Sequence, residues 1–201
     1  MIKAIIFDLW GTLATKNVPI SKTLQEKFAI PKTEDFARRY EEDVQLNQWE
    51  TEEEMAGSFL SKFGLEHKAD SVGFIVDLFR RGINGATLFD GIPELLTTLK
   101  TNGYKLGLLS NTTVFEAVAL NQLGIAKFFD AVLFSWQTGK LKPANEMFDQ
   151  ILAKLEVTKE ESIFIDDNKQ NIAAAQVYGI QAIRFESVPQ ITQELSHPFN
   201  L

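Results

Sequence analysis

From residue 91 onward, short apolar runs alternate with amphipathic segments, and this alternation limits the fold of the 201-residue chain more than any other feature. A first apolar run, Ile2 to Phe7, is rich in β-branched residues, as in a strand buried on both faces of a parallel sheet. Further strands are predicted over 104–109, 131–134, 162–165 and 180–185. Helices are predicted between them, over 92–101, 114–123, 144–155 and 168–178. Strands separated by single helices favour right-handed βαβ units, so we expect an α/β fold with a Rossmann-like, doubly wound parallel sheet.

Residues between the first strand and residue 87 break this alternation, because no comparably strong strand pattern occurs there. Helices are predicted instead, over 24–29, 34–46, 52–63 and 72–81. The charged runs RRYEED and ETEEE fall in this segment and are typical of solvated helix faces. We therefore predict a discontinuous core of residues 1–14 and 87–201, and an all-helical cap of residues 15–86 over the strand ends, with hinges near 14–15 and 82–87.

Composition excludes several kinds of site. The absence of cysteine rules out disulfides, thiolate metal sites and a thiol nucleophile, and two histidines are too few for a zinc site built on imidazoles. Twenty Lys+Arg against 27 Asp+Glu give a net charge of -7, which is unsuited to binding nucleic acid through the bulk surface.

No apolar run reaches the about 20 residues that span a bilayer, and Asp8 interrupts the N-terminal run too early for a secretory signal. We expect a cytoplasmic protein whose partner is a small-molecule substrate rather than a nucleic acid or a membrane.

Polar clusters follow four of the predicted strands. In chain order these clusters are Asp8-Leu9-Trp10-Gly11-Thr12, Ser110-Asn111-Thr112, Gly139-Lys140-Leu141-Lys142-Pro143 and Asp166-Asp167-Asn168. Each cluster alone has an ordinary explanation as a turn or a helix cap. Ligands of open α/β sheets, however, bind beyond the carboxyl ends of the strands, so four clusters at four such ends indicate one shared site.

The residue types in these clusters indicate metal-assisted phosphoryl chemistry. Asp8, Asp166 and Asp167 form an oxygen-rich set without thiol or imidazole, which suits Mg²⁺. A lysine and a hydroxyl at helix starts suit a phosphate group. A carboxylate that attacks a phosphoryl group meets charge repulsion, which a metal ion and a lysine would offset. This is the logic of covalent catalysis through an aspartyl-phosphate.

The motifs FDLWGTL, LLSN, GKLKP and FIDDN, in this order, resemble the haloacid dehalogenase (HAD) superfamily of hydrolases over essentially the whole chain. DxxGT alone is a weak signal, whereas four ordered motifs at suitable strand ends are specific. The resemblance implies that the helical insertion is the family's small cap. It also implies a nucleophile, Asp8, and a charge-neutralising lysine, Lys142, which Pro143 distinguishes from its rival Lys140.

The same resemblance implies a magnesium site and a substrate site. The metal ligands would be Asp8, the Trp10 carbonyl, Asp167 and, through water, Asp166. The substrate-binding residues would be Trp10, Thr12, Ser110, Asn111 and Lys142.

Position 10 departs from the phosphatase pattern of the family. Family phosphatases carry a second aspartate two residues after the nucleophile, where it protonates the leaving group and then activates water. Trp10 has no proton that titrates near neutral pH, and loss of a general acid/base typically costs about 10²–10⁴ in rate. The backbone carbonyl survives the substitution, so the metal and phosphate sites can persist.

Three interpretations remain open. The first, which we favour, is a Mg²⁺-dependent phosphatase for a small phosphorylated metabolite, either limited to good leaving groups or supplied with a proton by a cap acid (Glu41, Glu42 or Asp43). The second is a 2-haloacid dehalogenase, because those enzymes have an aromatic residue at this position and a cap arginine at about the spacing of Arg39; their Ser-x-Asn pattern, however, differs from Asp166-Asp167. The third is a degenerate phosphate-binding or regulatory protein. Trp10 itself either packs against the cap or stacks on the substrate.

Overall fold

The computed structural model describes residues 1–31, 33 and 35–199, with side chains up to residue 196. Five parallel strands form one sheet in the order β5-β4-β1-β6-β7, and this confirms the predicted α/β fold with its doubly wound parallel sheet. Their bounds are β1 Ala4–Phe7, β4 Lys105–Ser110, β5 Ala131–Phe134, β6 Ser162–Asp166 and β7 Gln181–Arg184. The central strand is β1, in which Phe7 lies opposite Leu108 of β4 and Ile165 of β6. This register brings the residues that follow β1, β4 and β6 to the same edge of the sheet.

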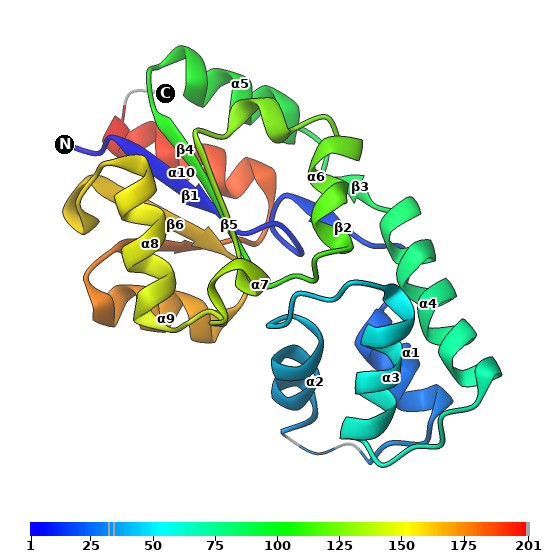
Figure 1. Ribbon diagram of the computed structural model, residues 1–201. Helices are drawn as coiled ribbons and strands as arrows, with labels where there is room; N and C mark the ends of the chain where they lie inside the picture. Colours follow the sequence, from blue (N-terminus) through cyan, green and yellow to red (C-terminus); the bar gives the residue numbers. More distant parts are fainter. Residues whose placement is uncertain (32, 34, 200–201) are drawn as a thin grey trace.

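Side chains of β1 alternate between the two faces of the sheet, and each face is covered by helices (Figure 1). Ile5 and Phe7 pack with apolar residues of α5 (Ile92–Thr101) and α10 (Val188–Phe199). Ala4 and Ile6 pack with apolar residues of α8 (Asn145–Leu155) and α9 (Lys169–Tyr178). Both faces of the central strand are therefore buried, which is why its sequence is continuously apolar.

The core differs from the sequence prediction in three places. The helix predicted over 114–123 is a 3₁₀ turn, η1 (Glu116–Val118), followed by the single turn α6 (Ala119–Gln122), because the Thr113 hydroxyl accepts from the Glu116 N–H and starts the turn there. Helix α10 was not predicted, although Ile191 and Leu195 have helical spacing and are fully buried beside α5. A short helix, α7 (Ser135–Thr138), also follows β5 directly.

Helices α1 to α4 form a second unit with its own apolar core (Figure 1). Their bounds are α1 Ile20–Lys27, α2 Phe36–Val44, α3 Glu52–Lys62 and α4 Ala69–Asn84. The helix predicted over 34–46 thus includes residue 34, which lies outside the described residues. Aromatic side chains supply much of the packing, with the Phe59 and Phe63 ring centroids 4.8 Å apart.

A short antiparallel ribbon lies at the two connections between the helical unit and the sheet. It consists of β2 (Ala14–Thr15) and β3 (Thr87–Leu88), in which Ala14 lies opposite Leu88. The sequence did not predict these strands, because two residues are too few to show a period. Among the helices of the described residues, none has the length and apolarity that crossing a membrane requires.

Candidate active site

Lys142 joins two carboxylates at the carboxyl edge of the sheet. Its Nζ lies 2.5 Å from Asp8 Oδ1 and 2.7 Å from Asp166 Oδ2. Asp8 follows β1 and Asp166 ends β6, and because these strands pair in parallel the two carboxylates lie next to each other. All three side chains are buried, so this ammonium and these carboxylates interact with little screening by water.

Hydrogen bonds fix the Asp166 carboxylate on both oxygens. Oδ1 accepts from the Asn168 N–H at 2.8 Å, and Oδ2 accepts from Asn171 Nδ2 at 2.9 Å in addition to Lys142. The Asn168 side chain in turn caps α9 by accepting from the Gln170 N–H. The start of α9 thus sets the position of Asp166.

Gly11 permits close approach between the loops that follow β1 and β6. Its φ is +87°, and a Cβ at this position would lie 2.5 Å from Asp167 Oδ2. The buried Thr12 hydroxyl accepts from the Asp167 N–H at 3.1 Å and joins the same two loops. The glycine of the DLWGT motif is therefore required by the carboxylate that packs against it.

Asp8, Asp166 and Asp167 form an oxygen cluster, in which one carboxylate oxygen of each residue lies within 4.8 Å of the others. Burial raises the pKa of Asp8 to about 7; Lys142 opposes this shift, whereas Asp166 and Asp167 add to it. Burial also lowers the pKa of Lys142, but Asp166 and Asp8 outweigh it and the net shift is upward. Three carboxylates facing one ammonium leave an excess of negative charge, which favours a hard divalent cation.

The sequence matches a known family: the model for haloacid dehalogenase-like hydrolases matches residues 2–179. The chain belongs to the haloacid dehalogenase-like hydrolase family. Pyrophosphatase PpaX of Listeria monocytogenes is 29% identical over 188 residues, which cover 86% of this chain and 78% of the relative.

Two solved structures of HAD proteins share the fold. A HAD-like family hydrolase from Porphyromonas gingivalis is 25% identical, with a TM-score of 0.68 and coverage of 97% of this chain and 98% of that chain. A HAD family enzyme from Bacteroides thetaiotaomicron, solved in complex with magnesium and inorganic phosphate, is 17% identical, with a TM-score of 0.66 and coverage of 94% and 96%.

In this HAD family member, Ser110 and Asn111 at the carboxyl end of β4 have different contacts. Ser110 is fully buried, and within the described part of the chain its Oγ has no hydrogen-bond partner. The Asn111 side chain accepts from the Lys142 N–H at 2.8 Å and donates to the Lys142 carbonyl at 3.3 Å. Asn111 thus holds the backbone of Lys142, a role that its place in the LLSN motif does not reveal.

A cleft of about 660 Å³ opens between the sheet edge and helix α2. The predicted site residues that line it are Asp8, Trp10, Asn111, Lys142, Asp166 and Asp167. Thr12 and Ser110 are fully buried and are not among the lining residues. From the helical unit, Tyr40, Glu41 and Gln45 face the cleft. The buried Ser135 hydroxyl donates to the Gln45 carbonyl at 2.7 Å, so the end of α2 is bonded to the core.

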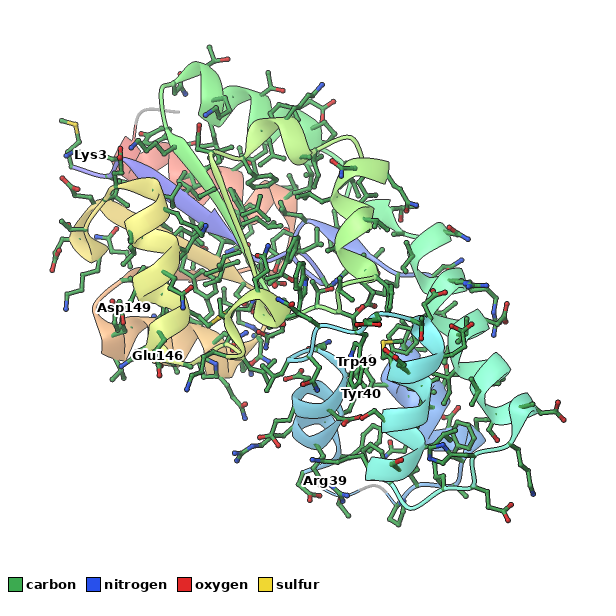
Figure 2. All side chains as sticks on the ribbon, viewed as in Figure 1. Lys3, Arg39, Tyr40, Trp49, Glu146 and Asp149 are labelled. Carbon is green, nitrogen blue, oxygen red and sulfur yellow. The ribbon has the colours of Figure 1, made fainter. Side chains whose placement is uncertain are left out.

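The two lysines of the GKLKP motif lie in different surroundings, and Arg39 lies away from the site. Lys140 is exposed, and its Nζ lies 3.4 Å from Glu146, which α8 carries on the outer surface (Figure 2). Arg39 Nη2 donates to the Lys62 carbonyl at 3.0 Å, and its guanidinium lies 4.9 Å from the Phe63 ring centroid. Figure 2 shows Arg39 at the end of α2 that is remote from the sheet.

Sequence reasoning missed several residues around Trp10. Lys16 lies with its Nζ 4.2 Å from the centroid of the Trp10 ring and forms a salt bridge with the fully buried Glu116. Gln45 is buried, and within the described residues its Oε1 has no hydrogen-bond partner. No motif indicates these side chains, because they come together only when the helical unit packs on the core.

Proposed function

We propose that this HAD family hydrolase is a Mg²⁺-dependent phosphatase, which transfers a phosphoryl group from a small phosphorylated metabolite to Asp8 and then to water. The observation that carries the proposal is the contact of Lys142 Nζ with Asp8 Oδ1 at 2.5 Å, inside a cluster of three carboxylates. A nucleophilic carboxylate, a fixed ammonium and an oxygen-rich cation site are the parts that this transfer needs.

The donor set fits Mg²⁺, because its ligand atoms are carboxylate oxygens and their charge exceeds that of Lys142. Asp8, Asp167 and the Trp10 carbonyl would hold the ion directly, and Asp166 through water. The saturated hydrogen bonding of Asp166 supports this division, since both of its oxygens already accept from protein donors. When bound, the ion supplies Lewis-acid stabilisation of negative charge on the phosphoryl oxygens.

Asp8 and Lys142 have direct roles in the transfer of the phosphoryl group. An Asp8 carboxylate oxygen attacks phosphorus while the bond to the leaving oxygen breaks, which yields an aspartyl-phosphate. Lys142 keeps its charge and offsets the charge that gathers between Asp8 and the phosphoryl group. Ser110, which the resemblance also assigns to the phosphoryl group, is fully buried and does not line the cleft, so we assign it no contact with the substrate. Water then attacks the same phosphorus, so inorganic phosphate leaves and the Asp8 carboxylate is restored.

The helical unit acts as the cap in this proposal. A volume of about 660 Å³ is suited to a small metabolite, and α2 forms one wall of the cleft. The β2–β3 ribbon lies at the expected hinges, so opening would separate Gln45 from Ser135 and admit substrate. The named activity of the Listeria relative, a pyrophosphatase, and the magnesium and phosphate bound to the Bacteroides enzyme support a phosphorylated substrate.

The proposal is tested by hydrolysis of p-nitrophenyl phosphate with Mg²⁺ and with EDTA, with Asp8→Asn as the control, followed by pyrophosphate and phosphoglycolate. We expect turnover that needs both Mg²⁺ and Asp8. Wild-type turnover no higher than that of Asp8→Asn on all three substrates would contradict a phosphatase. Release of chloride from 2-chloropropionate in EDTA would instead favour the dehalogenase interpretation, against which the position of Arg39 argues.

A further inference from the structure

Phosphate-ester cleavage needs a proton for the departing oxygen, and position 10 does not supply one. The Trp10 Nε1 donates to Thr112 Oγ1 at 3.1 Å, and an indole N–H does not ionise near neutral pH. The acid must therefore come from another element that reaches the cleft.

Three consecutive carboxylates on α2 point in different directions. Glu42 accepts from Arg38 Nε at 2.7 Å, one turn back along the same helix. Asp43 accepts from Ser58 Oγ at 2.9 Å, which ties it to α3. Glu41 lines the cleft together with Asp8 and Lys142. Of the three, only Glu41 is placed to meet a substrate bound at Asp8.

The face of α2 that carries Glu41 is held against the core. Gln45 lies one turn further along the helix, on the same face, and also lines the cleft. The Ser135 hydroxyl donates to the Gln45 carbonyl at 2.7 Å in a buried contact. This bond fixes the end of α2 beside the strand end of β5, one turn from Glu41, which lines the same cleft as Asp8.

The surroundings of Glu41 shift the pKa of its carboxyl group upward. Burial raises its pKa, Lys142 lowers it, Asp166 raises it, and the net shift is upward. A carboxyl group that retains its proton closer to neutral pH is a better donor to a leaving oxygen.

We propose that Glu41 of the cap is the general acid and base of this site, in the place that Trp10 cannot fill; the proposal rests on the phosphatase function above. As the bond between phosphorus and the leaving oxygen breaks, the Glu41 carboxyl gives its proton to that oxygen and the alcohol departs. The Glu41 carboxylate then takes a proton from the water that attacks the aspartyl-phosphate. Inorganic phosphate, the Asp8 carboxylate and protonated Glu41 result, so protons and charge balance over the cycle.

The test compares Glu41→Gln with Glu42→Gln on p-nitrophenyl phosphate and phenyl phosphate, two esters of similar shape whose leaving groups differ in their need for a proton. We expect Glu41→Gln to lower kcat/KM for phenyl phosphate by about 10²-fold or more, but for p-nitrophenyl phosphate by less than about tenfold. Because the second step also loses its base, Glu41→Gln should release a burst of p-nitrophenol stoichiometric with enzyme. Glu42→Gln should match the wild type on both esters.

Equal losses on the two esters, or no loss, would overturn the role of Glu41. An Asp8→Asn variant in the same assay separates this result from failure of the phosphatase function. If Asp8→Asn is inactive while Glu41→Gln keeps wild-type rates, only the Glu41 role is wrong. If the wild type is no faster than Asp8→Asn, the phosphatase function and the role of Glu41 are both overturned.

Discussion

The Trp10 indole donates its N–H to Thr112 Oγ1 over 3.1 Å, and this bond holds the edge of the ring against the loop that follows β4. The Thr112 hydroxyl in turn donates to Glu116 Oε2 at 3.3 Å. Glu116 pairs with Lys16, whose ammonium lies over the face of the same indole. Trp10 is therefore part of a polar network that joins the chain segment between β1 and the helical unit to the core.

Breaking the Lys16–Glu116 pair should destabilise the fold. Glu116 is fully buried, so Lys16→Met leaves a buried charge without its partner and should lower the free energy of unfolding by about 3 kcal/mol. The double variant Lys16→Met/Glu116→Gln should recover part of this loss, because no unpaired buried charge remains. Urea denaturation measures both, with the exposed Lys22→Met as control. Strictly additive losses would contradict the coupling.

Gly11→Ala should weaken Mg²⁺ binding, whereas Gly103→Ala should not. Both glycines have similar positive φ values, +87° and +82°, so backbone strain alone should cost about 1–2 kcal/mol of stability in each variant. Only at Gly11 would the new Cβ collide with Asp167, since no described residue lies within 4 Å of a Cβ at position 103. Calorimetric titration with Mg²⁺ should show a loss of about tenfold or more for Gly11→Ala alone. Equal affinities would argue that Asp167 is not a ligand.

Lys142→Gln should lower kcat strongly, whereas Lys140→Gln should leave it almost unchanged. Lys142 contacts Asp8 and Asp166 in a buried site, so its loss should lower kcat by about 10³-fold, the scale on which single electrostatic groups act. Lys140 pairs with Glu146 at the surface, and its replacement should leave kcat within about twofold. Comparable losses in the two variants would require a different neutralising residue.

Mg²⁺ affinity should depend on pH through Asp8. Burial raises the pKa of this carboxyl to about 7 in the metal-free protein, so below pH 7 the proton must leave before the carboxylate can bind a cation. Affinity should therefore rise about tenfold per pH unit from about pH 5 to 7 and then level off. Calorimetry in buffers of different ionisation enthalpy measures the released proton directly. Asp8→Asn should abolish the slope, and a wild-type affinity that is flat over this range would refute the coupling.

The alternation of apolar runs and amphipathic helices was enough to predict the parallel sheet and the helical insertion, because both patterns are local. It also predicted the shared position of Asp8 and Asp166, since the carboxyl ends of parallel strands meet at one edge. Helix α10 and the β2–β3 ribbon escaped prediction, the ribbon because two-residue strands have no period.

Only the tertiary structure decided what individual side chains do around that edge. Lys140 and Lys142 are two residues apart in one motif, yet one is exposed and the other is buried between carboxylates. Glu41 and Glu42 are chain neighbours, but adjacent positions of a helix face different directions: Glu41 lines the cleft, whereas Glu42 accepts from Arg38. Such choices depend on how the helical unit is placed against the sheet, and no local pattern in a sequence records that placement.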